Sequence, residues 1–176
     1  MQRRSSKSKT VPPDNVDCSV FAPAAIRSGA EALIQVFLHI PEDAIVALSI
    51  AATADASIDR QITHALNIPV ERGTSIEIFF DPGGLVIPTG GATNETVLWN
   101  GQPTSCAFRV KAPEGLFPKN YYPAIRVAVD GILIGCITFA VRCSLWARTG
   151  TPLLAGVAKA YRTLLFHTHQ RIDPKF

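Results

Sequence analysis

Four cysteines and four histidines are the residues of this chain whose types best suit catalysis or metal binding, and they are scattered along it. There is no CxxC pair and no histidine at zinc-finger spacing, so a zinc module is not indicated. His167 and His169 are spaced to ligate a metal from one face of a strand, but the sequence places no third ligand near them. We predict no metal site and no cofactor. These residues are Cys18, Cys106, Cys136, Cys143, His39, His64, His167 and His169.

Motifs for a nucleophile or a phosphate are also missing. No serine lies in a G-x-S-x-G elbow, and a cysteine nucleophile requires a positioned base that the sequence does not identify. The stretch 81–91, D-P-G-G-L-V-I-P-T-G-G, is glycine-rich but lacks the Lys-Ser/Thr ending and the following helix of a phosphate loop. We interpret its glycines as turn residues and predict that the chain is not an enzyme. A small hydrolase using a loop cysteine and a histidine is the weakest alternative.

Three aromatic residues are the candidate binding residues: Trp99, Tyr121 and Tyr122. Aromatic side chains contribute a large share of the binding energy of many protein interfaces. In a β-sandwich, however, such residues more often belong to the core or to a corner. The sequence leaves both interpretations open.

Compartment is inferred from cysteine usage and from the first residues. The first ten residues are basic and no apolar segment follows them, so they match neither a signal peptide nor a membrane anchor. Elsewhere the apolar runs are too short or too interrupted to span a bilayer. We therefore predict a cytoplasmic location and free thiols, with an inter-sheet disulfide as the alternative. A glycosylation sequon at Asn94-Glu95-Thr96 has meaning only in a secreted protein.

Charge argues against nucleic acid as a partner. The chain of 176 residues carries 17 basic and 14 acidic residues, a net charge of +3. Much of the excess lies in the first ten and the last fifteen residues, which leaves the middle nearly neutral and without a basic binding face. Residues 1–15 lack any periodicity, and we predict that they form a disordered basic tail.

The strongest structural signal is a hairpin centred on Asp130-Gly131. Alternating β-branched runs flank this dipeptide, which tolerates the positive φ of a tight turn. A strict two-residue turn would place Ile125, Val127 and Val129 on the same face as Ile132, Ile134 and Cys136. The bulky apolar positions further on have the opposite parity, and they are Ile137, Phe139 and Val141. Side chains alternate with period two, so we predict a β-bulge at Gly131 or Gly135.

Further short strands with turn residues between them predict a mainly β fold, an immunoglobulin-like antiparallel β-sandwich over residues 16–145. In the longest strand, 31–40, the parity of Ile34, Val36, Leu38 and Ile40 predicts the core face. Asn100-Gly101 is a candidate hairpin turn. The predicted strands are 18–21, 31–40, 64–70, 74–80, 85–87, 96–99, 105–111 and the hairpin; Pro69 places 64–70 at a sheet edge.

Two helices are predicted beside the strands. Pro41, followed by two acidic residues, suits a helix N-terminus. An apolar stripe to about residue 56 follows it, made of Ile45, Leu48 and Ala52 with Ala44 and Ala51 beside them. Pro152 begins a second helical pattern, in which Leu153, Val157, Tyr161 and Leu164 recur at helical spacing. We assign residues 146–176 to a linker helix and tail.

Several motifs together resemble the N-terminal module that precedes Toll/interleukin-1 receptor (TIR) domains in some bacterial multidomain proteins. The resemblance covers roughly residues 16–162 and implies an interaction or sensing module of a signalling or defence protein, with a protein partner. The motifs are Asp17-Cys-Ser-Val-Phe-Ala-Pro23, Gln35-Val-Phe-Leu-His-Ile-Pro41, Val97-Leu-Trp99, the Asp130-Gly131 hairpin and Ala158-Lys-Ala-Tyr-Arg162.

The TIR domain itself is not recognisable after Arg162. The resemblance implies an apolar strand followed by Ser-Tyr-Ala-Ser, an acidic residue and Arg, whereas the chain continues T-L-L-F-H-T-H-Q-R-I-D-P-K-F. Back-translating this tail and reading it one base earlier permits the expected order of residues. Our hypothesis is that a frameshift removed the TIR domain, so its NAD-cleaving activity and self-association are not expected here.

The resulting prediction is a non-catalytic interaction or sensing module that lacks its TIR domain. The alternative is a secreted or surface immunoglobulin-like domain with a structural or adhesive role and paired cysteines.

Overall fold

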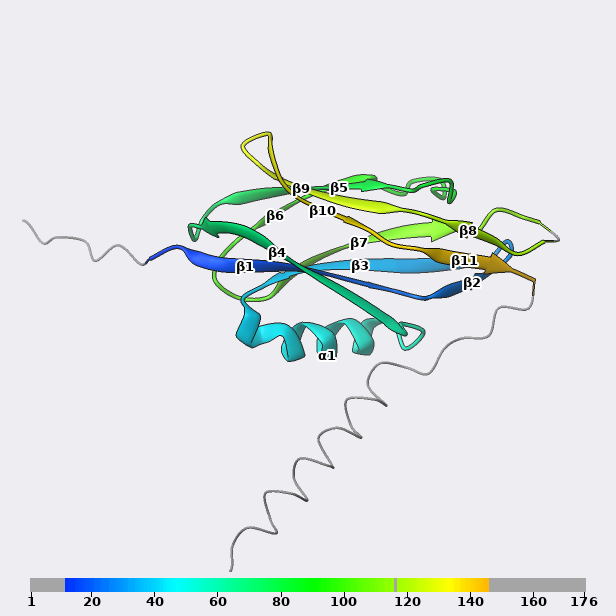
Figure 1. Cartoon of the computed structure of the whole chain (residues 1–176), viewed down its shortest axis with the longest axis horizontal. Helices are drawn as coiled ribbons and strands as arrows, with labels where there is room; N and C mark the ends of the chain where they lie inside the picture. Colours follow the sequence, from blue (N-terminus) through cyan, green and yellow to red (C-terminus); the bar gives the residue numbers. More distant parts are fainter. Residues whose placement is uncertain (1–11, 116, 146–176) are drawn as a thin grey trace, which may run out of the picture.

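The computed structural model of the chain describes residues 12–115 and 117–145, and these form a β-sandwich with one α-helix (Figure 1). One four-stranded sheet has the order β4-β1-β3-β7 and the other has the order β10-β9-β5-β6. Neighbours in both sheets are antiparallel. The strands are β1 Asp14–Ala22, β3 Glu31–His39, β4 Arg60–Val70, β5 Ser75–Asp81, β6 Asn94–Leu98, β7 Thr104–Lys111, β9 Ala124–Val129 and β10 Ile132–Thr138.

A third, three-stranded sheet has the order β2-β11-β8 and lies toward one end of the body (Figure 1). Its strands are short: β2 Ala25–Arg27, β8 Lys119–Tyr121 and β11 Val141–Ser144. β11 pairs parallel with β2 and antiparallel with β8. This sheet joins the segment after β1 to the last described strand. The predicted mainly β sandwich with one inserted helix is thus confirmed, while the predicted C-terminal helix lies outside the described residues.

The central hairpin forms as predicted. Asp130 and Gly131 adopt φ values of 50° and 74° at the turn between β9 and β10. The register then shifts between Leu133 and Gly135, so Ile134 is the extra residue of a bulge. Gly135, beyond the bulge, lies against β4, since a Cβ there would lie 2.7 Å from Cδ2 of Leu66 and the leucine side chain would have to shift. The parity change therefore occurs where the two large sheets meet.

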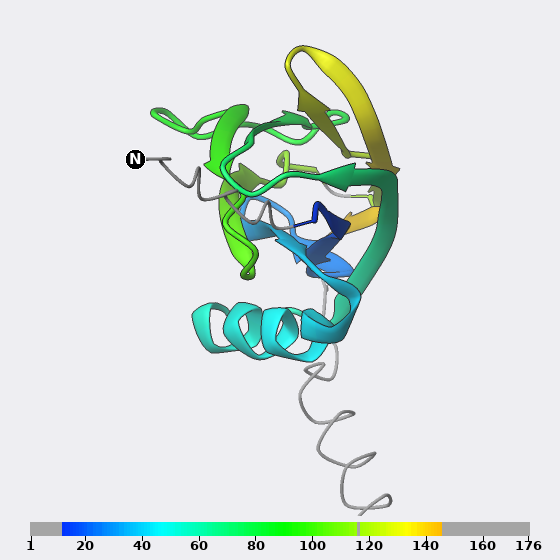
Figure 2. The same ribbon diagram turned by 90° about the vertical axis from the view of Figure 1, so that its left-hand side faces the viewer.

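The core lies between the two large sheets, and a second apolar cluster lies outside it. The inner face of β3 is Ile34, Val36 and Leu38, as predicted. Its outer face is buried as well, which the alternation did not predict, because helix α1 (Ala44–Ala54) covers it. Figure 2 shows the helix lying against this outer face. The second cluster consists of Phe21, Phe37, Ala47, Leu48, Ala51 and Ile58.

The helix begins as predicted but presents a different stripe. A 3-10 turn, η1 (Pro41–Asp43), leads into α1, with Pro41 at the start and two acidic residues in the first turn. Leu48 and Ala51 of the predicted stripe are buried, together with Ala47, whereas Ile45 faces solvent. The prediction was wrong for Ile45, because small alanines allow the helix to lie close to Phe21 and Phe37, and the bulkier residues are left outside.

Three further predictions are corrected. Leu85-Val86-Ile87 is not a strand, since only Val86 forms a bridge, to Lys111. Asn100-Gly101 does not close a hairpin, because β6 and β7 belong to different sheets. β1 begins at Asp14, so residues 14 and 15 belong to the sandwich and not to the tail. The edge position of β4 is confirmed.

Replacing Leu48 with Ala should lower the free energy of unfolding by about 2–4 kcal/mol, because the side chain fills the cluster between α1 and the outer sheet face. Urea denaturation measures the loss. Ile50→Ala on the exposed side of the same helix is the matched control and should cost less than about 1 kcal/mol. Equal losses for the two variants would contradict this packing.

Candidate binding surface

One polar cluster resembles a catalytic site because a serine is hydrogen-bonded to a histidine. It joins Ser19, His39 and Thr63 across β1, β3 and β4. His39 Nδ1 lies 2.8 Å from the Ile40 carbonyl oxygen, which can only accept, so Nδ1 carries the proton. In a neutral imidazole Nε2 then accepts from the Ser19 hydroxyl at 2.7 Å, and Ser19 Oγ accepts from the Thr63 hydroxyl at 2.7 Å. Each group in this chain of hydrogen bonds therefore has a defined role.

Burial assigns this chain of hydrogen bonds a structural role. Ser19 and His39 are both fully buried, and the second partner of the histidine is a backbone carbonyl rather than a carboxylate. A substrate has no path to the serine hydroxyl. The hydrogen bonds satisfy polar groups that α1 and η1 remove from water. His64, by contrast, is exposed on β4.

All four cysteines are free, and they lie on strands rather than loops. Burial raises the pKa of the Cys18 and Cys143 thiols, and it raises the pKa of Cys106 to about 12. These shifts are opposite to those of an activated nucleophile. Cys18 and Cys106 lie on β1 and β7, two strands apart in one sheet, roughly 10 Å at the usual strand spacing and so beyond disulfide reach.

The described residues were compared with the requirements of a metal site and of a membrane-spanning helix. Among the residues that the structure describes, no three His, Cys, Asp or Glu side chains gather closely enough to hold a metal ion. His167 and His169 lie outside those residues. In the same part of the chain, no helix has the length and the apolar content that crossing a membrane requires.

The structure separates the three predicted aromatic binding residues. Trp99 is fully buried and follows β6 at one end of the sandwich. Tyr121 is half-buried on β8, and Tyr122, the next residue, is 59% exposed. Trp99 therefore offers no ring surface to a partner, and a binding role remains a prediction only for the two tyrosines.

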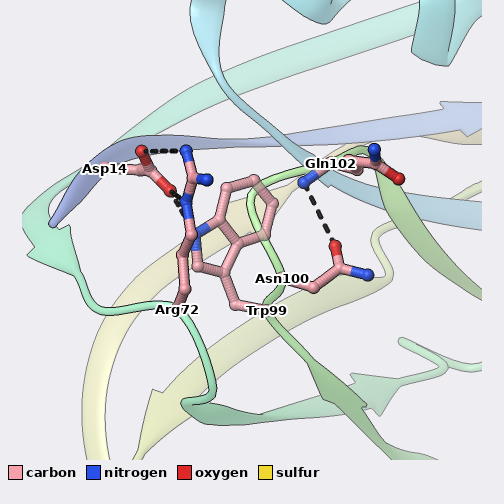
Figure 3. Close-up of polar contacts among 5 residues, drawn as sticks. All are labelled: Asp14, Arg72, Trp99, Asn100 and Gln102. Atoms are coloured by element: carbon pink, nitrogen blue, oxygen red, sulfur yellow. Dashed lines mark hydrogen bonds and ion pairs between the residues drawn. The ribbon is translucent and has the colours of Figure 1, made fainter. Parts of the chain in front are cut away.

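Trp99 instead belongs to a polar closure of its end of the sandwich (Figure 3). Its indole Nε1 donates to Asp14 Oδ2 at 3.1 Å, and Arg72 donates to both Asp14 oxygens at 2.9 and 3.2 Å. Gly101 allows the guanidinium to approach the β6–β7 connection, since a Cβ there would lie 2.5 Å from Arg72 Nε. Beyond it the backbone N–H of Gln102 donates to Asn100 Oδ1 at 3.1 Å. One carboxylate thus ties the start of β1 to two loops.

Tyr121 and Tyr122 are positioned by the glycine turn after β5. Gly83 has a φ of 55°, and a Cβ there would clash with the carbonyl oxygen of Tyr122. Gly84 lies against the Tyr121 ring in the same way, since a Cβ there would lie 3.0 Å from Cδ1 of the ring. The two glycines therefore allow a turn to pack directly on the tyrosine pair. Gly83 and Gly84 are thus turn residues, as predicted.

A notch of about 210 Å³ opens beside Tyr121, between β8 and the loop that precedes it. Phe117, which is 84% exposed, lines it together with Glu114, and Lys119 lies with Nζ 5.1 Å from the centre of the Tyr121 ring. Ser28 anchors the loop, since its hydroxyl donates to the Pro113 carbonyl at 3.3 Å and accepts from the Gly115 amide at 2.9 Å.

The notch is smaller than the roughly 300–1,000 Å³ of small-molecule sites and suits a single inserted side chain. A more open depression of about 490 Å³ continues from it and includes Gly29 and Leu145, beside the last described strand. Phe117, Glu114 and Lys119 were not predicted. The only sequence signal was one aromatic in the Pro- and Gly-rich stretch 113–118, where no periodicity buries it.

Comparison with known proteins gives no family assignment: no model of a protein family and no curated protein matches the chain.

Asp14 makes stability dependent on acid pH. Its hydrogen bond from Arg72 is the main reason that the Asp14 pKa lies below 3.8, so the carboxylate stabilises the fold above that pH and loses this effect as the pH falls through its lowered pKa. The urea midpoint of the wild type should exceed that of Asp14→Asn by a constant amount from about pH 7 to pH 5 and by less below 3.8. A difference that does not narrow on acidification would contradict this closure.

Proposed function

We propose that this chain is the non-catalytic interaction or sensing module of a bacterial TIR-type signalling or defence protein and that it acts in the cytoplasm. The mainly β fold and the motifs that resemble such modules support the proposal. The buried Ser19–His39 pair and the raised thiol pKa values give no support to a hydrolase. Recognition through loops on a rigid sandwich then accounts best for the exposed groups.

The observation that carries the binding proposal is the notch beside Tyr121. It combines an almost fully exposed phenylalanine with a carboxylate, an ammonium group and the edge of an anchored tyrosine ring. An exposed aromatic beside a concave site is the type of anchor found at the centre of protein interfaces. The partner we propose is a protein that inserts one aliphatic or aromatic side chain into the notch.

Site-specific photocrosslinking tests the notch. A benzoylphenylalanine at position 117 should yield a discrete crosslinked species in bacterial cytosol, competed by unlabelled wild-type chain and lost when Glu114 is also changed to Lys. The matched control is the same probe at Ile132, which is 69% exposed at the tip of the β9–β10 hairpin. Identical products from both positions, or none from position 117, would contradict the proposal.

The nucleotide sequence of the gene tests the relationship to TIR proteins. Reading on from the codon for Arg162 in the alternative frame should give an open frame that begins with an apolar strand and Ser-Tyr-Ala-Ser. An alternative frame that closes at once, or that encodes no such sequence, would contradict the relationship to TIR proteins while leaving the proposal for the notch unaffected.

A thiol titration separates the cytoplasmic module from the secreted alternative. Denatured protein prepared without reductant should show four thiols, as expected from four free cysteines. In the native protein only Cys136 should react rapidly, because Cys18 and Cys143 are buried and Cys106 is mostly covered. Fewer than four thiols after denaturation would favour the structural or adhesive surface domain with paired cysteines.

A further inference from the structure

Strand β10 forms one edge of its sheet, and among the described residues it pairs only with β9. β4 contacts it from the inner face, where Leu66 lies against Gly135, but no ladder of hydrogen bonds joins the two strands. Ile132 and Leu133 are 69% and 58% exposed, and Figure 2 shows the β9–β10 hairpin (yellow) reaching beyond the rest of the sandwich. The free edge of β10 can therefore accept a further strand.

The composition of β10 differs from that of the other edge strands. Proteins normally protect a sheet edge from further pairing with charged residues or proline. The residues of β10, I-L-I-G-C-I-T, include neither. Each of the other described edge strands carries at least one charge: Arg60 in β4, Arg109 and Lys111 in β7, Glu95 in β6, Arg27 in β2 and Lys119 in β8. β10 is thus the edge best suited to bind another strand.

The bulge in β10 limits which strand can bind. Cys136 is paired with the exposed Arg126, and Leu133 has the same outward direction three positions earlier, because Ile134 is the extra residue. An ordinary strand that matched the faces of β10 on one side of the bulge would be one residue out of step on the other side. A partner for the whole edge must therefore carry an extra residue at the same place.

A second copy of β10 meets this requirement. Two antiparallel copies related by a two-fold axis just after Ile134 place Leu133 opposite Cys136 and Ile132 opposite Ile137. Outward side chains then lie beside outward side chains along the whole edge, and inward beside inward, because the two extra residues meet at the axis and offset each other. No like charges meet, since the strand has no charged residue.

We propose that two copies of this chain associate through antiparallel pairing of their β10 strands, which joins the two β10-β9-β5-β6 sheets into one continuous sheet. Antiparallel pairing keeps the two Asp130 carboxylates at opposite ends, whereas parallel pairing would bring them together. Each copy uses its β10 edge once, so the assembly closes as a dimer. One pair of short strands buries less than a standard interface, and the dimer is therefore weak and concentration-dependent. It involves neither the notch nor the TIR resemblance.

Analytical ultracentrifugation of the full chain, under reducing conditions and over a series of concentrations, tests the association. The wild type should shift from monomer to dimer as the concentration rises. Leu133→Lys should raise the dissociation constant by about tenfold or more, because the dimer contains the new charge twice. Leu98→Lys is the matched control, since this residue is 57% exposed on β6 at the other edge of the same sheet, and it should leave the constant unchanged. A wild type that stays monomeric, or equal effects of the two variants, would overturn the proposal.

Disulfide crosslinking tests the register. Leu133→Cys should give a covalent dimer on mild oxidation with copper phenanthroline, because directly opposite Cβ atoms lie about 4.5–5.5 Å apart, close to the separation within a disulfide. The same variant combined with Cys136→Ser should stay monomeric on a non-reducing gel. Thr138→Cys should also stay monomeric, since it shares the outward face but lies opposite Gly131 of the second copy. Crosslinking of Thr138→Cys to the same extent, or none for Leu133→Cys, would overturn this pairing.

Discussion

Two-sided burial of β1 and β3 is the constraint on which the rest of this molecule depends. Their inner side chains form the sandwich core with β5 and β9, and their outer side chains lie under α1. Strands that are covered on both faces leave their polar side chains without access to water. Ser19 and His39 then bond to each other, Ser19 also bonds to the Thr63 hydroxyl, and His39 also bonds to the Ile40 carbonyl. Gln35 likewise donates to the Ala51 carbonyl at 3.0 Å. What resembles a catalytic pair is thus a consequence of covering the sheet.

The surfaces that differ from the rest of the sandwich lie at its two ends. The two ends differ in character: one is closed by the Asp14 carboxylate, which holds Trp99 and Arg72, and the other carries the notch between β8 and its preceding loop. A closed end uses its aromatic internally, whereas an open end exposes Phe117 to solvent. An interaction module requires this combination, because a rigid body with satisfied polar groups can hold a small number of exposed anchors in fixed positions.

Local signals in the sequence identified the hairpin, the bulge and the start of the helix, because each depends on neighbouring residues. Asp130-Gly131 carries its own turn geometry, and the parity change before Ile137 required an extra residue. What failed depended on contacts distant in sequence. Asn100-Gly101 has a hairpin dipeptide, yet β7 pairs with β3, more than sixty residues earlier, rather than with β6. The burial of Phe37 required knowing that the next helix folds back over its strand.

The candidate site was predicted in part, since Tyr121 lies in the notch while Trp99 lies in the core. The residue type alone could not separate them, because neighbours from distant parts of the chain decide whether an aromatic is buried. For Trp99 that neighbour is the Asp14 carboxylate. The central claim, that α1 and the sandwich form one cooperative unit around doubly buried strands, is tested most directly by native-state hydrogen exchange at increasing urea concentration. The account predicts that amides of α1 at 47–51 and of β3 at 34–38 lose protection in one shared transition. Full protection of β3 after α1 has become exchangeable would contradict it.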